Sequence, residues 1–231
     1  MEKIGIIGAM DVEVSQLKAA LLDPEPLKRA RMDFVKGTLS GKPVVVVQSG
    51  VGKVNAGICG QILCDLGCDA LVFTGVAGSL DARVGVLDLV VSTDCMYYDV
   101  DVQNLGYAPG EIPQMGIVSF PADALLREKA LHAAQGIASH HHVFEGRVAS
   151  GDRFVHEIQD KASIHSMSGA LCCEMEGAAV AQACYLNAVP YVVIRAISDT
   201  ADGSNPMAYP LFEQKAARLC SRIISQMVAE L

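Results

Sequence analysis

Carboxylate side chains from three distant parts of the sequence are the residues best suited to chemistry. Glu13 lies near the N-terminus, Glu174 and Glu176 flank Met175, and Asp199 follows a late apolar run. Two carboxyl groups in different environments can act as the acid and the base of one reaction. If the fold brings these side chains to one pocket, they form an acid–base catalytic site.

Each carboxylate also has a purely structural explanation. Glu13 alone could be a solvated residue in the first turn of a helix, where acids interact favourably with the helix dipole. Asp199 could close an Asx turn or cap a helix. Glu174 and Glu176 differ, because the neighbouring Cys, Met, Gly and Ala residues indicate burial, and a buried carboxylate requires partners. That segment favours function over a solvent-facing role.

The elements that would position these side chains are strands of a parallel sheet. Ligands of open α/β sheets bind beyond the carboxyl ends of the strands, and Glu13 and Asp199 each follow such an end. A glycine-rich turn at 49–53 and the segment 75–79 follow two further strands, and 152–155 follows another. Apolar runs predict strands at 3–10, 34–39, 43–48, 70–74, 88–92, 143–150 and 189–197.

Predicted strands alternate with helices from end to end, which indicates a single domain over residues 1–231. The class is α/β, with a three-layer α/β/α sandwich around a mixed, mostly parallel central sheet. A C-terminal amphipathic helix is predicted by the apolar stripe of Phe212, Ala216, Leu219, Ile223 and Met227. The stretch 96–119 is instead rich in Tyr, Asp, Gly and Pro and predicts a long ordered loop, a type that is usually functional or interfacial.

Composition limits the partners of this chain. Its 231 residues carry 18 Lys and Arg against 26 Asp and Glu, a net charge of −8, without a basic run. Nucleic-acid binding is therefore not expected, and a small, weakly charged ligand fits better. No apolar run approaches the roughly 18 residues that span a bilayer, so no membrane association is expected. Eight cysteines within apolar stretches and a start without a signal peptide indicate the reducing cytoplasm.

Common cofactor and metal motifs are missing from the sequence. The turn 49–53 lacks the glycine spacing and the Ser/Thr of a P-loop, and the first strand offers no GxGxxG. The histidines at 140–142 would alternate in direction and have no Cys or acid cluster beside them. Neither a Ser-His-Asp nor a Cys-His arrangement is recognisable. We therefore expect no cofactor and no metal.

Seven segments, in order along almost the whole chain, resemble one family. The sequence is similar to 5′-methylthioadenosine/S-adenosylhomocysteine nucleosidases, within the nucleoside phosphorylase-like superfamily. The resemblance implies hydrolysis of the N-ribosidic bond of both compounds, releasing adenine and a thio-ribose. The matching segments are IGIIGAMDVEV (4–14), SGVGKVNA (49–56), FTGVAGSL (73–80), YDVDV (98–102), ASGDRFV (149–155), CEMEGAAVA (173–181) and VVIRAISDTAD (192–202).

The resemblance also implies roles for the carboxylates. Glu13 would activate the attacking water, and Asp199 would donate a proton to N7 of the departing adenine. Glu176 would bind the 2′- and 3′-hydroxyls of the ribose, with Met175 under the sugar. Arg195 and Ser198 would orient Glu13 and Asp199. Asp199 must be protonated when it acts, so we expect burial or neighbouring carboxylates to raise its pKa.

Further residues would hold the base and the 5′ substituent. The resemblance implies that Phe154 stacks on the purine and that the Val155 backbone reads its edge. The family is generally homodimeric, with the long loop reaching across to the partner's site. The apolar 5′ pocket would comprise Met10, Val51 and Tyr209, together with Leu105, Tyr107 and Pro113 from a partner chain.

One position departs from the family pattern, and three rival functions stay open. Many members carry Ser where this chain has Val76, which removes a hydroxyl near the expected water. A phosphorylase of the same fold would need cationic residues where Glu13 stands, since a carboxylate repels phosphate. An aminodeoxyfutalosine nucleosidase would differ in its 5′ substituent. A non-catalytic binding protein would have no reason to keep Glu13, Glu176 and Asp199 together.

Overall fold

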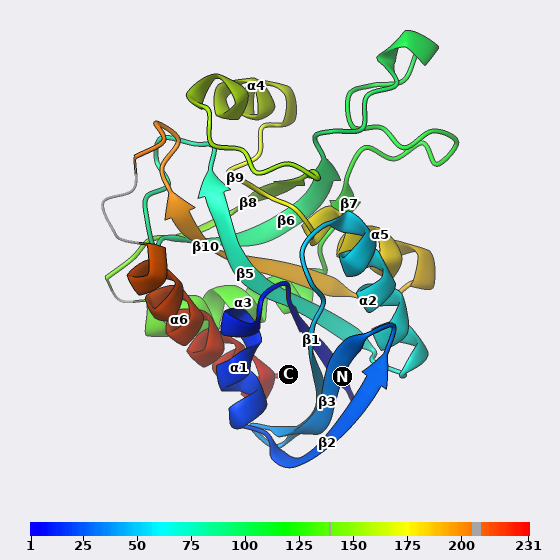
Figure 1. The fold of residues 1–231 in the computed structure, drawn as a ribbon, viewed down its shortest axis with the longest axis vertical. Coiled ribbons are helices and arrows are strands. Elements are labelled where there is room, and N and C mark those ends of the chain that lie inside the picture. The colour runs from blue at the N-terminus through cyan, green and yellow to red at the C-terminus, as the bar shows by residue number, and fades with distance from the viewer. Residues whose placement is uncertain (139, 205–208) are drawn as a thin grey trace.

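A mixed ten-stranded sheet forms the centre of the molecule (Figure 1). The computed structural model describes residues 1–138, 140–204 and 209–231, and the side chains of 209, 210 and 213 also lie outside this description. The strands are β1 (Ile4–Gly8), β2 (Leu22–Arg29), β3 (Met32–Leu39), β4 (Lys42–Gln48), β5 (Ala70–Ser79), β6 (Leu89–Tyr97), β7 (Phe120–Pro121), β8 (Val143–Ser150), β9 (Cys172–Glu174) and β10 (Tyr191–Asp199).

The sheet mixes parallel and antiparallel pairings, with antiparallel neighbours on both sides of β1 and β4. Strand β1 pairs in parallel with β4 and β5, and β5 pairs in parallel with β10. The edge strands β3 and β2 are antiparallel. On the other side, the pairings β5–β9–β8–β6–β10–β5 form a closed ring of five strands. This ring brings the carboxyl ends of β5, β8, β9 and β10 together.

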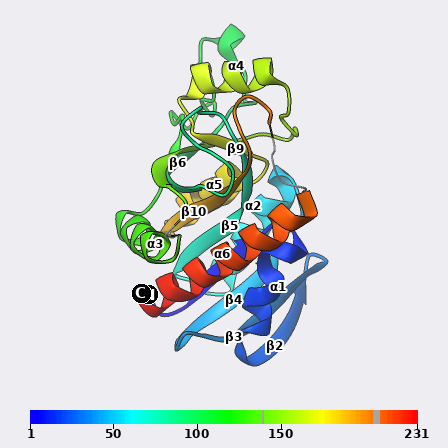
Figure 2. The same cartoon turned by 90° about the vertical axis from the view of Figure 1, so that its left-hand side faces the viewer.

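Helices cover both faces of the sheet, as the three-layer prediction requires. On one face α2 (Lys53–Asp65) packs against α5 (Gly177–Asn187), and on the other α6 (Tyr209–Ala229) packs between α1 (Asp11–Ala19) and α3 (Ala124–Ile137). Figure 2 shows the second group facing the viewer, in front of the sheet, with α4 (Ile158–Ser168) set apart beyond the strand ends. Each face has its own buried apolar cluster.

Local sequence explains the central elements well. Strand β1 reads IGIIG and is entirely buried because it lies between β4 and β5. The predicted stripe of α6 faces the core, since Phe212, Ala216, Ile223 and Met227 are at most 1% exposed. Leu219 is partly buried against the same cluster.

Among the elements that differ from the sequence prediction, two have a clear physical reason. Strand β2 was not predicted, because it carries two prolines and its residues are mostly exposed. Proline is tolerated there because β2 is an edge strand with a free side. Strand β5 continues to Ser79, so 75–79 is strand rather than a turn. Its pairing with β10 continues through Gly78, opposite Asp199, and this partner maintains the extended backbone.

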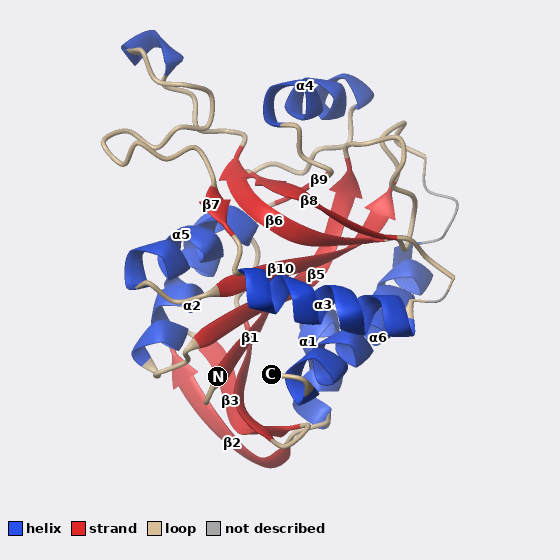
Figure 3. Cartoon of the chain, turned by 180° about the vertical axis from the view of Figure 1, so that it is seen from behind, coloured by secondary structure: helices blue, strands red, loops and turns tan. Residues whose placement is uncertain are grey.

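The segment between β6 and β7 extends away from the rest of the molecule (Figures 1 and 3). It contains a short 3-10 helix, η1 (Gln103–Leu105), and an isolated bridge between Ile112 and Ile117. The predicted loop 96–119 is thus present, except that its first two residues belong to β6. A search of the described helices finds none with the length and apolar character needed to cross a bilayer.

Candidate active site

A cavity of about 400 Å³ lies at the carboxyl ends of the strands. Its walls come from the β1–α1 junction, the end of β5, the segment after β8, the β9–α5 junction and the end of β10. This is the position that the strand-end rule predicts. The lining residues are Ala9, Met10, Glu13, Val51, Val76, Ala77, Gly78, Arg153, Phe154, Val155, His156, Cys173, Glu174, Met175, Glu176, Ser198, Asp199 and Gly203.

Glu13 is buried in the first turn of α1 and held by backbone amides. The amide of Met10 donates to Oε2 at 2.9 Å, and the amide of Val76 donates to Oε1 at 3.1 Å. A Cβ atom at Gly75 would lie 2.5 Å from Oε1, so only glycine permits this approach. Burial raises the pKa of Glu13, although the charge of Arg195 and the amides oppose the rise. A buried carboxyl group with a raised pKa is a suitable general base.

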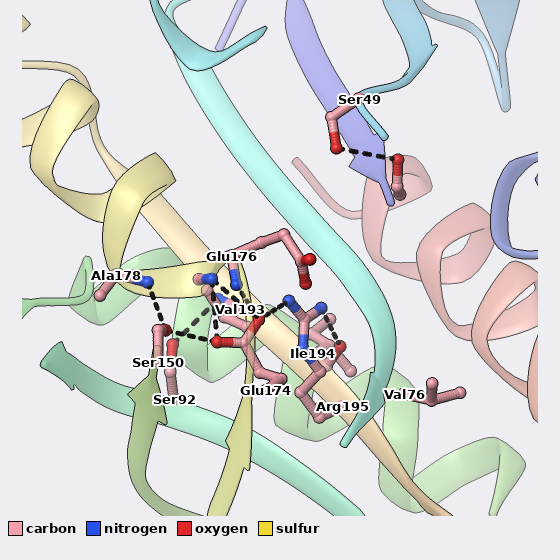
Figure 4. A network of polar contacts seen from close by, with 12 residues as sticks. Ser49, Val76, Ser92, Ser150, Glu174, Glu176, Ala178, Val193, Ile194 and Arg195 are labelled. Atoms are coloured by element: carbon pink, nitrogen blue, oxygen red, sulfur yellow. Dashed lines mark hydrogen bonds and ion pairs between the residues drawn. The ribbon is translucent and has the colours of Figure 1, made fainter. Parts of the chain in front are cut away.

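Glu174 is the centre of a buried polar network below the cavity (Figure 4). The amide of Gly177 donates to Oε1 at 2.9 Å and to Oε2 at 2.8 Å, so the carboxylate binds the start of α5. The Ser150 hydroxyl donates to Oε1, and Nη2 of Arg195 donates to Oε2 at 2.5 Å. Arg195 therefore forms its ion pair with Glu174, whereas the carboxylate of Glu13 is bound by backbone amides. Its charge acts on Glu13 through space.

Glu176 lines the same cavity beside this network and is 6% exposed. The amide of Gly52 donates to Oε1 at 2.7 Å, and Gly52 has a φ of +98°, which favours glycine. Burial, followed by the negative charge of Glu174, raises the pKa of Glu176 to about 7. The glycine-rich turn 49–53 thus positions a carboxylate rather than a phosphate. Met175 lines the cavity beside it.

Asp199 ends β10 and accepts hydrogen bonds on both carboxylate oxygens. The Ser198 hydroxyl donates to Oδ1 at 2.6 Å. Lys161 of α4 forms an ion pair with Oδ2. The sequence predicts that Asp199 is buried or lies beside other carboxylates. The charged group in contact with its carboxylate is instead the ammonium group of Lys161.

Apolar side chains line the remaining wall, as the resemblance implies for the base and the 5′ substituent. Met10 and Val51 line the cavity, and Val51 is half-exposed. Val155 is buried, whereas Phe154 is 75% exposed and stacks on His156 with ring centroids 6.1 Å apart. In this structure Phe154 is therefore available to a ligand at the entrance of the cavity.

Three of the expected pocket residues do not line this cavity, and a fourth cannot be placed. The side chain of Tyr209 lies outside the described residues. Leu105, Tyr107 and Pro113 belong to the projecting segment, and no residue of 98–119 lines the cavity of its own chain. Pro113 instead lines a separate surface hollow beside α2 and α5.

Val76 contributes its backbone where many relatives would offer a hydroxyl. Its amide binds Glu13, and its side chain is partly buried against the α6 side of the core. The carboxylate of Glu13 is therefore held without a hydroxyl at this position.

Lys161 and Ser150 were missed by the sequence analysis, and Glu174 was named without a role. A lysine in a short polar helix gives no sequence signal of burial, because lysine is usually solvated. The burial of Ser150 was indicated only by its place at the end of a strand. The roles of Glu174 and Glu176 can be distinguished only in the tertiary structure, which shows that Glu174 is the one paired with Arg195.

No metal cluster is found in the part of the chain that the structure describes: no three His, Cys, Asp or Glu side chains converge suitably. All eight cysteines are free thiols, and seven of them are buried.

Comparisons with known proteins agree with this geometry. The model of the phosphorylase superfamily matches residues 3–229. A 5′-methylthioadenosine/S-adenosylhomocysteine nucleosidase of Staphylococcus aureus is 39% identical, covering 99% of this chain and all of the relative.

Two solved structures are similar over the whole of this chain. A nucleosidase of the same description from Neisseria meningitidis, in complex with methylthio-immucillin-A, has a TM-score of 0.93 and 34% identity, and is itself covered completely. The futalosine hydrolase of Helicobacter pylori has a TM-score of 0.90 and 34% identity, with 98% of it covered. The chain belongs to the phosphorylase superfamily and, within it, to the family of 5′-methylthioadenosine/S-adenosylhomocysteine nucleosidases.

Proposed function

We propose that this protein hydrolyses the N-ribosidic bond of 5′-methylthioadenosine and S-adenosylhomocysteine, releasing adenine and the thio-ribose. The observation that carries the proposal is the convergence of Glu13, Glu176 and Asp199 on one cavity of about 400 Å³. The full-length similarity to nucleosidases of these two compounds supports the choice of substrate.

The reaction separates charge, and the site meets each charge with a suitable group. Breaking the bond between C1′ and N9 leaves positive charge on the ribose and negative charge on adenine. Glu176 stabilises the cationic sugar and accepts hydrogen bonds from its 2′- and 3′-hydroxyls. Asp199 gives a proton to N7, and Glu13 takes a proton from the attacking water. Such preorganised groups supply much of the rate enhancement of enzymes.

The apolar wall holds the two ends of the nucleoside. Phe154 stacks on the purine, and the backbone of Val155 hydrogen-bonds to its edge. Met175 packs under the ribose. Met10 and Val51 contact the 5′-thio substituent, for which polarizable and apolar side chains are suitable.

The 5′ pocket is completed in a homodimer. Leu105, Tyr107 and Pro113 lie on a segment that extends away from its own cavity, so the partner's copy of this segment is the one that closes each site. Tyr209 is assigned to the same pocket from the sequence alone. We infer that residues 1–231 act as one domain, since one family model spans 3–229. The free thiols are consistent with a cytoplasmic protein.

Adenine release in phosphate-free buffer tests the proposal directly. Purified protein should release adenine from both compounds without phosphate, and in ¹⁸O-water the label should appear on C1 of the sugar. Strict dependence on added phosphate would instead identify a phosphorylase. The carboxylate of Glu13 at the nucleophile position makes that outcome unfavourable, since it would repel phosphate.

Aminodeoxyfutalosine is a second candidate substrate. The futalosine hydrolase of Helicobacter pylori and the nucleosidase of Neisseria meningitidis share the same sequence identity with this chain, 34%. The same carboxylates would serve it, and only the 5′ substituent would differ. Comparing kcat/KM on the three compounds ranks them. We expect methylthioadenosine and S-adenosylhomocysteine to be preferred.

A further inference from the structure

Lys161 is a buried lysine to which the proposed mechanism gives no role. Its side chain is 1% exposed although it lies on α4, at the outer end of the molecule. Its ammonium group contacts Oδ2 of Asp199 and donates to the carbonyl of Thr200 at 2.7 Å. Burying a lysine is unfavourable unless it is paired, so the ion pair with Asp199 is what allows Lys161 to be buried at this position of α4.

The surroundings of Asp199 pose a problem for an acid. A general acid must carry a proton when the leaving group departs. Asp199 instead accepts hydrogen bonds on both carboxylate oxygens, from Ser198 on Oδ1 and from Lys161 on Oδ2. The pair as a whole is neutral, however, and holds one proton more than an ionised aspartate alone. That proton resides on the lysine.

We propose, on the basis of the hydrolysis proposed above, that Lys161 is a positioning residue that stores the proton that Asp199 passes to N7 of adenine. The geometry that carries this inference is the direct contact of the buried ammonium group with the carboxylate at the end of β10. Lys161 itself does not line the cavity, so it acts through Asp199.

The proposed transfer balances in atoms and charge. As the C1′–N9 bond breaks, its electron pair moves into the purine and N7 becomes basic. The N7–H bond forms with a proton from Asp199, and Oδ2 receives a proton from Nζ of Lys161, which becomes a neutral amine. The water oxygen bonds to C1′, and its proton goes to Glu13. After the products leave, Glu13 releases the water proton to solvent and the amine takes one proton from solvent, so the enzyme returns to its starting state and no other reactant is required.

The other titratable groups near this pair do not supply the proton. The thiol of Cys173 on β9 interacts with both Lys161 and Asp199, but burial raises its pKa to about 12 and the thiol is a poor donor. Arg153 is engaged by Asp160 of α4, and Asp202 accepts from Thr200 and Ser204. The further titratable groups are His156, Glu157 and His165 on or beside α4, and Glu174, which ends β9.

A substrate with an acidic leaving group separates this role from a structural one. We choose the 4-nitrophenyl glycoside of 5-methylthioribose, because 4-nitrophenolate departs without protonation. Lys161→Met should lower kcat on methylthioadenosine by about 10²-fold, with KM within about threefold. On the nitrophenyl glycoside the same variant should stay within about threefold of wild type. Equal losses on both substrates, or no loss on either, would overturn the proposal.

The pH profile and a charge-preserving variant give an independent test. Without the lysine, Asp199 must hold the proton itself, so the alkaline limb of kcat/KM on methylthioadenosine should move to lower pH in Lys161→Met. Lys161→Arg keeps the charge but does not release its proton, and it should remain as slow as Lys161→Met. Full rescue by arginine, or an unmoved alkaline limb, would contradict proton storage.

Lys28→Met is the matched control, because Lys28 pairs with Asp33 on the surface and both side chains are largely exposed. It should leave both substrates and the pH profile unchanged. Wild-type protein that releases no adenine would instead refute the proposed hydrolysis. The two hypotheses thus fail in distinguishable ways.

Discussion

Arg195 and Glu174 form a buried ion pair in which Nη2 lies 2.5 Å from Oε2, with the two side chains 1% and 3% exposed. The guanidinium group also lies over the ring of Phe73, with 4.0 Å between Cζ and the ring centroid. Glu174 in turn binds the amide that begins α5 and the hydroxyl that ends β8. The pair therefore joins the strand ends and the helix that carry Glu176 and Asp199.

Breaking this pair should destabilise the protein strongly. Glu174→Ala leaves a buried guanidinium group without its partner and should lower the free energy of unfolding by about 3–5 kcal/mol. Asp33→Ala removes the exposed partner of Lys28 and should cost less than about 1 kcal/mol. Urea unfolding of both variants measures the difference. Similar small losses in the two would show that the buried pair does not hold the strand ends together.

Removing the base at Glu13 should abolish turnover while leaving the binding of adenine intact. Glu13→Gln keeps the shape of the side chain but does not accept the water proton, so kcat should fall by about 10²–10⁴-fold. Calorimetry with adenine should give a Kd within about threefold of wild type. Because burial raises the pKa of Glu13, wild-type kcat/KM should rise with pH as that group ionises. A kcat/KM that falls as pH rises through the ionisation of Glu13 would contradict the role of this residue as the base.

The pKa of about 7 at Glu176 predicts a pH dependence of ribose binding. The ionised carboxylate accepts hydrogen bonds from the sugar hydroxyls, so a non-hydrolysable nucleoside analogue should bind more tightly as pH rises from 6 to 8 (about one unit on either side of this pKa). Glu176→Gln should bind weakly at every pH. A wild-type Kd independent of pH would remove Glu176 from the ribose site.

The same raised pKa affects folding stability, with a sign that can be checked. Between about pH 4.5 and 7 the folded protein keeps the Glu176 proton that the unfolded chain has lost, so this group's contribution to stability falls as pH rises. Glu176→Gln lacks this penalty and should gain stability relative to wild type towards pH 8, on the order of 1–3 kcal/mol. Thermal unfolding at pH 5 and pH 8 measures the change. If Glu176→Gln and wild type differ in stability by the same amount at pH 5 and pH 8, the raised pKa of Glu176 is contradicted.

Removing the acid at Asp199 should slow adenine departure specifically. Asp199→Asn preserves the shape of the side chain but does not protonate N7, and kcat on methylthioadenosine should fall by about 10²–10⁴-fold. Ser198→Ala removes only the hydroxyl that donates to Oδ1 at 2.6 Å and should cost about tenfold. Wild-type turnover in Asp199→Asn would refute the assignment. Single-turnover measurement of adenine release separates this step from product dissociation.

The projecting segment should matter for assembly and for the 5′ end of the substrate. Leu105 is 69% exposed in the single chain. Leu105→Asp should weaken the proposed dimer, as seen by analytical ultracentrifugation, and raise KM for methylthioadenosine more than for adenosine. A monomeric wild-type protein with full activity would rule out the partner's contribution.

Local patterns in the sequence were enough for the main elements. Apolar runs such as IGIIG and the stripe from Phe212 to Met227 predict buried strands and an amphipathic helix, because burial in these elements follows a regular period. The strand-end rule then placed Glu13 and Asp199 near one another. It did so because the carboxyl ends of parallel strands share one edge.

Tertiary contacts decided which charged groups face each other. The edge position of β2 allows a strand to form despite its two prolines. Strand β5 extends to Ser79 because β10 continues beside it. Pairing of Arg195 with Glu174, and of Lys161 with Asp199, joins residues 21 and 38 positions apart. Such pairings depend on side-chain direction and on the closure of five strands into a ring, which no local period of the sequence encodes. The sequence thus determined the elements and the carboxylates, and the tertiary structure determined the electrostatic partner of each.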